Sequence, residues 1–216
     1  MKETIVAAGK ILEGLGLVGG FGHVSARVDK ETFIMTPKKS PALVEPDELV
    51  LLDNEGNVLS GSPPLEMPLH AAVYRRRGDV AAICRVHAFY ASVLAAARIP
   101  LKAVHGFGCH VDREVPLYEG LTDLVTTQAQ GEGVADCLGN GDAVIIRANG
   151  TLVTGNSVEQ ACVRAVYLEE SARMLHQALL VGEPAYLGAE EYSARRMWCL
   201  EEQRRAWEYY TSRFGG

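Results

Sequence analysis

A buried strand is predicted at VAAICRVH, residues 80–87, because this short stretch is almost continuously apolar. The alanine-rich stretch AFYASVLAAA, residues 88–97, follows it directly and predicts a helix. AVIIRA, residues 143–148, repeats the strand pattern. Strands that are apolar on both faces need helices on both sides of their sheet, so these segments indicate a layered α/β domain.

The other segments supply the remaining layers. Apolar residues at three-to-four spacing predict helices over 2–15, 66–77, 159–180 and 189–213, and one or two helices over 121–138. Apolar runs bounded by turn residues predict strands near 23–28, 32–36 and 49–52, and DNEG at 53–56 predicts a hairpin turn. The expected fold is a three-layer α/β/α arrangement with a central, largely antiparallel mixed sheet, in a single domain over residues 1–216.

The composition is typical of a globular domain: 216 residues, 48% hydrophobic and 22% charged, with a formal net charge of −6. The negative charge and the dispersed cations argue against a nucleic-acid partner, and no apolar run reaches the roughly 18 residues of a membrane span. We therefore expect a cytoplasmic protein. The five cysteines are odd in number and lack CxxC spacing, which predicts buried thiols instead of disulfides or structural zinc.

Four short segments place polar residues beside glycines or at strand ends. They are GGFGHVSAR (19–27), TPKKSP (36–41), PPLEMPLH with CRVHAFY (63–70 and 84–90), and IIRANGTLVTG (145–155). In this order and spacing the chain resembles the class II aldolase and adducin family over nearly its whole length. The resemblance implies the fold of a carbon–carbon lyase, closer to the family's decarboxylase-like branch than to its sugar-phosphate aldolases.

The resemblance also exposes an altered metal site. Family members hold a divalent metal with three histidines, and the matching positions here are Arg85, His87 and Asn149. Residues two apart on a strand face the same side, so the Arg85 guanidinium would repel a dication at His87, and an asparagine oxygen is a poor zinc ligand. We expect no cofactor; the alternative is zinc or manganese on His87 together with His105 or His110.

Three interpretations of Arg85 remain open. It supplies the fixed positive charge that the metal would have supplied, and so stabilises an enolate or carboxylate. Alternatively, a metal site is rebuilt around His87 with His23, His105 or His110, while Arg85 meets a substrate carboxylate. The third interpretation is a structural arginine in a dead site.

The expected catalytic residues are Glu66, Arg85, His87 and His70. A glutamate that opens a helix is often only a favourable charge at the helix N-terminus, but the neighbouring His87 strand favours acid/base work by Glu66. His70 lies one helical turn after Glu66, so it either orients Glu66 or is a core histidine.

The substrate is expected to be a small carboxylated molecule without phosphate. Family sugar-phosphate aldolases bind phosphate through paired serines, and Pro64 and Leu65 stand at those positions here. The residues expected to bind substrate are His23, Ser25, Arg27, Thr36, Lys38, Ser40, Asn149 and Tyr210. Tyr210 is included because, in the family, a C-terminal tyrosine of a neighbouring subunit can complete the site. Family members form tetramers, so the resemblance implies a homotetramer.

These features predict a lyase that performs decarboxylation or aldol cleavage and condensation. A metal-free dehydratase, isomerase or cyclase on the same fold is the alternative, because a fold does not determine a reaction. A non-catalytic scaffold is the third hypothesis, and a buried polar set around Glu66, His70, Arg85 and His87 argues against it.

Overall fold

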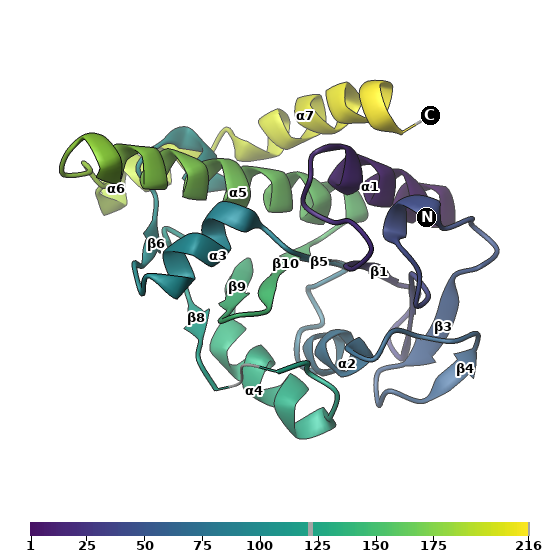
Figure 1. Cartoon of the computed structure of the whole chain (residues 1–216). Helices are drawn as coiled ribbons and strands as arrows, with labels where there is room; N and C mark the ends of the chain where they lie inside the picture. Colours follow the sequence, from purple (N-terminus) through teal and green to yellow (C-terminus); the bar gives the residue numbers. More distant parts are fainter. Residues whose placement is uncertain (121–122, 216) are drawn as a thin grey trace.

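The computed structural model describes residues 1–120 and 123–215. Its main sheet has eight strands in the order β4-β3-β2-β1-β5-β10-β9-β8 (Figure 1). These strands are β1 (His23–Arg27), β2 (Thr32–Met35), β3 (Val50–Asp53), β4 (Val58–Ser60), β5 (Ala82–Val86), β8 (Leu117–Tyr118), β9 (Ala143–Ile146) and β10 (Gly150–Gly155). All neighbours are antiparallel except β8 and β9, which confirms the expected mixed sheet.

Helices cover both faces of this sheet and complete the three layers (Figure 1). One face carries α1 (Lys2–Gly14), α3 (Phe89–Ala96), α5 (Val158–Val181) and, over them, α7 (Cys199–Phe214). The opposite face carries α2 (Met67–Arg76) and α4 (Gln128–Leu138). The predicted strand at 80–87 is β5, in the middle of the sheet and fully buried, which is why its sequence is apolar on both faces.

Short elements complete the chain. A second, two-stranded sheet pairs β6 (Leu101–Lys102) with β7 (Glu114–Val115), and two 3-10 turns are η1 (Pro41–Leu43) and η2 (Gly106–His110). Among the described residues the cysteines are all free thiols, four of them buried, as expected. In the part of the chain that the structure describes, no helix combines the length and the apolarity that crossing a bilayer requires.

One predicted helix boundary was wrong, and the strands β6, β7, β8 and β10 were not predicted. The helix expected over 189–213 is divided by a turn at Met197 and Trp198 into α6 (Ala189–Arg196) and α7, and Arg196 at the end of α6 pairs with Asp142. The segment 121–138 contains α4, which begins at a capping box formed by Thr127 and Gln130; residues 121–122 lie outside the described residues. Of the missed strands, β10 is the longest and the one that lies beside β5.

Ion pairs hold α2 against α4. Arg75 and Arg76 at the end of α2 both pair with Glu132 of α4, and Arg76 also reaches Asp136. The side chains of Arg75 and Glu132 are only about a quarter exposed, so this cluster is better ordered than a typical surface pair. It keeps α2 in place, and Glu66 is the residue that precedes the first turn of α2.

Candidate active site

All four polar segments converge on one cavity of about 570 Å³. The glycine-rich segment contributes Phe21 and His23, and the next segment contributes Lys38. The remaining segments contribute residues that include Leu65, Glu66, His87 and Asn149. Segments separated by up to about 130 residues of sequence thus form a single pocket, as expected for side chains at strand ends.

Glu66, Asn149 and Arg85 form a continuous hydrogen-bonded set at the base of this cavity. The amide Nδ2 of Asn149 donates to Glu66 Oε1 at 2.7 Å, and Arg85 Nη2 lies 3.3 Å from Glu66 Oε2. Arg85 Nη2 also donates to both oxygens of Asn149, the backbone oxygen at 2.7 Å and Oδ1 at 2.6 Å. Because Oδ1 accepts from a guanidinium, the Asn149 amide must point its NH₂ at Glu66.

Arg85 lies beneath the pocket and not in its wall. Its side chain is 0% exposed, and Nη1 donates to the carbonyl of Val86 at 2.8 Å. Burial lowers the pKa of Arg85, while Glu66 acts in the opposite direction. Arg85 therefore meets substrate only through Glu66 and Asn149, which makes it a positioning residue.

The sheet and a tight turn put these groups together. In the register of β1, β5 and β10, Arg85 lies opposite His23 on one side and Leu152 on the other. The β9–β10 turn has positive φ at Ala148 (62°) and Gly150 (127°), and it presents Asn149 between them. A Cβ on Gly150 would lie 2.7 Å from Arg85 Nη1, so only glycine leaves room for the guanidinium.

Two neutral histidines border the pocket. Desolvation, followed by the charge of Arg85, lowers the pKa of His87 to about 4, although Glu66 and a hydrogen bond with the Phe21 backbone oppose this shift. Burial lowers the pKa of His23 well below its usual range, with His70, Arg85 and His87 adding to the effect. The His87 ring nitrogen that faces the Phe21 backbone carries the proton, so its other nitrogen is a hydrogen-bond acceptor.

His70 is a core histidine. It is 0% exposed, and its Nδ1 lies 2.8 Å from Ser25 Oγ, which in turn lies 2.8 Å from the Tyr74 hydroxyl. The described residues show no hydrogen bond between His70 and Glu66. Of the two roles open for His70, the structure therefore favours packing over orientation of Glu66.

The other residues expected to bind substrate divide into two groups. His23, Lys38 and Asn149 line the cavity. The side chains of Ser25, Thr36, Ser40 and Arg27 instead form hydrogen bonds within the fold. Ser25 bonds to His70, Thr36 Oγ1 accepts from the Val24 amide at 3.2 Å, and Ser40 Oγ donates to the Gly19 carbonyl at 2.6 Å. Arg27 donates to the carbonyls of Tyr74, Arg77 and Val80. Tyr210 lines a different cavity.

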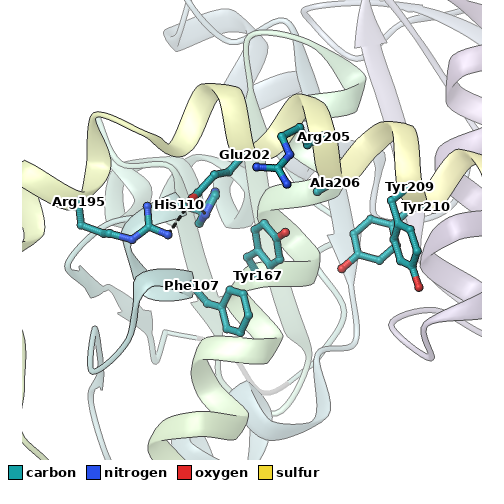
Figure 2. A pocket seen from close by; sticks show the side chains of 9 residues that line it. All are labelled: Phe107, His110, Tyr167, Arg195, Glu202, Arg205, Ala206, Tyr209 and Tyr210. Atoms are coloured by element: carbon teal, nitrogen blue, oxygen red, sulfur yellow. Dashed lines mark hydrogen bonds and ion pairs between the residues drawn. The ribbon is translucent and has the colours of Figure 1, made fainter.

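That second cavity, of about 430 Å³, lies between η2, α5 and α7 (Figure 2). Here His110 Nε2 lies 3.2 Å from Glu202 Oε2, and Arg195 Nη2 donates to Glu202 Oε1 at 2.7 Å. His110, Cys199 and Glu202 place one possible ligand atom each within 4.8 Å of one another. The structure thus groups His110 with α7, and it does not bring His110 or the exposed His105 together with His87.

A side-chain relay determines which nitrogen of His110 carries the proton. The backbone N–H of Asn156 donates to Gln160 Oε1 at 2.9 Å, and Gln160 Nε2 donates to Gln203 Oε1 at 3.0 Å. Gln203 Nε2 is then left to donate to His110 Nδ1 at 3.3 Å. His110 Nε2 therefore carries hydrogen toward Glu202, and this group is a hydrogen-bonded anchor for α7 and not a prepared metal site.

The comparisons with known proteins agree with this geometry. Residues 3–176 match the Class II Aldolase and Adducin N-terminal domain. The chain belongs to the class II aldolase and adducin family. A solved L-fuculose 1-phosphate aldolase superposes on this family member with a TM-score of 0.83 at 27% identity, covering 91% of this chain and 94% of that one.

The named relatives of this chain include both aldolases and decarboxylases. It is 29% identical to a 5-deoxy-D-ribulose 1-phosphate aldolase of Bacillus thuringiensis serovar kurstaki, over 88% of this chain and 91% of that protein. It is 28% identical to a 3,4-dihydroxyphthalate decarboxylase of a Terrabacter species, over 89% and 87% of the two chains. These names confirm the expectation of a lyase-type enzyme, and the residues of the site must indicate which reaction.

Class II aldolases typically use a divalent metal, and the residues of this family member do not fit one at the matching place. The buried Arg85 guanidinium fills the space beside Asn149 and donates to Asn149 Oδ1, the oxygen that a metal would need. A cation at this position would also compete with Arg85 for Glu66.

The buried histidines predict that acid destabilises the fold. Burial, followed by the charge of Arg85, lowers the pKa of His70 to about 3 from an ordinary value of 6.5. Between these values only the unfolded chain takes up the proton. The stabilisation is complete above pH 6.5 and is lost as the pH falls, by about 1.4 kcal/mol per pH unit from His70.

Urea unfolding at a series of pH values between neutrality and about pH 4 measures this slope. We expect the free energy of unfolding to fall steadily across this range, and His70→Asn to flatten the slope. A slope that is the same in wild type and His70→Asn would show that His70 is not the group responsible.

Proposed function

We propose that this protein is a carbon–carbon lyase that acts by decarboxylation or aldol chemistry on a small, carboxylated, non-phosphorylated substrate. The observation that carries the proposal is the Glu66 carboxylate, which lines the cavity and is held there by Arg85 and Asn149. A carboxylate that is buried, oriented and still open to a cavity is the arrangement that proton transfer requires.

Glu66 would move the proton. Asn149 Nδ2 and the Val125 amide both donate to Oε1, at 2.7 and 3.3 Å, and Arg85 stands 3.3 Å from Oε2. In aldol cleavage Glu66 would accept the hydroxyl proton as the carbon–carbon bond breaks and return it to the carbanion. In decarboxylation the bond pair would stay on the substrate carbon, carbon dioxide would leave, and Glu66 would relay a solvent proton to that carbon.

Arg85 and His87 would support this transfer from different sides. Arg85 would hold a positive charge under the site without contacting substrate. Its burial supports the interpretation in which Arg85 supplies the fixed positive charge that the metal would have supplied. His87 borders the cavity with an acceptor nitrogen that suits a substrate hydroxyl. Pro64 and Leu65 line the cavity at the positions of the phosphate-binding serines, which supports a substrate without phosphate.

A metal-free dehydratase, isomerase or cyclase is the second candidate, because the guanidinium in the metal position fits such reactions as well. A scaffold without activity is disfavoured, since the cavity is open and polar at its base.

We also propose that the protein is a homo-oligomer. Three large apolar side chains around the start of α7 are exposed: Met197 by 83%, Trp198 by 62% and Leu200 by 67%. Their exposure supports a contact between subunits.

Product analysis separates these candidates. Purified protein is incubated with a panel of small hydroxy and keto acids, with and without a chelator. Release of carbon dioxide or an aldehyde that persists with chelator is the expected result. A product with the mass of its substrate would exclude the lyase, and activity abolished by chelator would show that a metal takes part.

A further inference from the structure

We propose that the cavity selects a planar aromatic carboxylate, with its ring against Phe21, Leu65 and Leu124 and its carboxylate on Lys38. This inference rests on the proposed function, because it places the reacting carbon toward Glu66. It concerns which molecules enter the cavity, and binding measurements test it without any turnover.

The mouth of the cavity is apolar and uncovered. Phe21, Leu65 and Leu124 line it and are 79%, 56% and 43% exposed, and the rings of Pro37 and Pro64 extend the same wall. Large apolar side chains that are exposed singly are normal, but several around one cavity indicate a surface that a ligand covers. A sugar, which carries a hydroxyl on nearly every carbon, would leave this wall poorly matched.

The glycine-rich loop holds Phe21 in place for ring contact. The Phe21 ring lies 6.5 Å from the His87 ring at an interplanar angle of 72°, an edge-on arrangement. Gly22, directly after it, has a φ of 124°, and a Cβ there would lie 2.5 Å from a methyl of Val18. The loop therefore brings an aromatic face to the edge of the cavity, where it can pack against a second aromatic ring.

The charge of the lining matches a single carboxylate. Arg85 neutralises Glu66 from below, and Lys39, which lines the cavity, pairs through Nζ with Glu48 Oε2 at 2.8 Å. Lys38 also lines the cavity, and its ammonium has neither an ion pair nor a side-chain hydrogen bond within the described residues. Among the described residues that line the cavity, Lys38 is therefore the cation that is available to bind an anion.

Leu65 favours the binding of a carboxylate over that of a phosphate. It stands where the resemblance places a phosphate-binding serine, and its side chain faces the cavity. A phosphate there would lose solvent without gaining hydroxyl donors, whereas a carboxylate can turn toward Lys38 and leave the ring on Leu65.

Calorimetric titration of the full-length protein tests the inference, with benzoate, cyclohexanecarboxylate and dihydroxyacetone phosphate as probes. Benzoate is expected to bind at least about tenfold more tightly than either of the others. Phe21→Ala, Leu65→Ser and Lys38→Met should each weaken benzoate by about tenfold. Leu43→Ala, which changes an exposed leucine outside the lining, should leave benzoate binding unchanged. Lys39→Met, which changes a lining lysine that is already paired with Glu48, should weaken benzoate less than Lys38→Met does.

Two outcomes would overturn the inference: equal affinity for the aromatic and saturated acids, or equal loss on changing Lys38 and Lys39. These outcomes are separate from failure of the proposed function. If benzoate binds as expected but no carbon–carbon bond is broken in any aromatic acid, the lyase proposal fails and the binding inference stands. If an aliphatic hydroxy acid is cleaved and benzoate does not bind, the reverse holds.

Discussion

Replacing Glu66 with glutamine lowers kcat by about 10²–10⁴-fold if Glu66 moves the proton. Glutamine keeps an oxygen to accept from Asn149 Nδ2 and the Val125 amide, so the local hydrogen bonds largely survive. It cannot take up a proton, and its NH₂ would face the Arg85 guanidinium. The expected result is a nearly inactive protein that is also less stable, because the buried Arg85 charge loses its anion. Steady-state kinetics on the substrate that product analysis identifies measures the loss of activity at a temperature where both proteins are folded.

Two further variants separate chemistry from stability. Glu66→Asp retains the charge that Arg85 needs but withdraws it by one methylene, and a displacement of about 1 Å is expected to lower kcat by about 10²-fold. Glu208→Gln is the matched control, because Glu208 is a carboxylate paired with Arg204 at the surface and outside the cavity. If Glu66→Gln turned over substrate at the wild-type rate while remaining folded, Glu66 would have no part in proton transfer.

Replacing Arg85 with methionine lowers the free energy of unfolding by about 3–5 kcal/mol, because it leaves a nearly buried carboxylate without its cation. Arg85 is 0% exposed and Glu66 is 7% exposed, so water reaches the carboxylate only from the cavity and does not replace the guanidinium beneath it. Arg85→Lys keeps the charge but cannot reach Val86, Asn149 and Glu66 at once, so it should not restore full stability or activity. Urea unfolding followed by circular dichroism measures these differences.

The control for Arg85 is Arg204→Met. Arg204 forms a surface pair with Glu208 one helical turn away, with side chains 66% and 60% exposed, and such pairs contribute only about 0.3–0.5 kcal/mol. The double variant Arg85→Met with Glu66→Gln should recover part of the lost stability, because it removes both buried charges. Equal effects of Arg85→Met and Arg204→Met would mean that the buried pair has no special role.

Local pattern was sufficient to predict most of the fold. The apolar run of β5, the helix that follows it and the helix that Glu66 precedes were all predictable, because burial imposes a period on the sequence. The division between α6 and α7 was not predictable, since no glycine or proline marks it, and Arg196 beside it pairs with Asp142 of a distant segment. Strand β10 was missed because its glycines at both ends hide a strand that only its neighbours β5 and β9 make evident.

The candidate site divides in the same way. The sequence by itself determined that Arg85, His87, Asn149 and Leu65 stand in these segments, and its resemblance to the family predicts the first three at the metal position and Leu65 at that of a phosphate-binding serine. Tertiary structure alone decided that Arg85 lies under the pocket, that Asn149 joins it to Glu66, and that His110 belongs to α7. The reason is physical: a residue's type and period are local, but its hydrogen-bond partner depends on strand register and turn geometry across the whole chain.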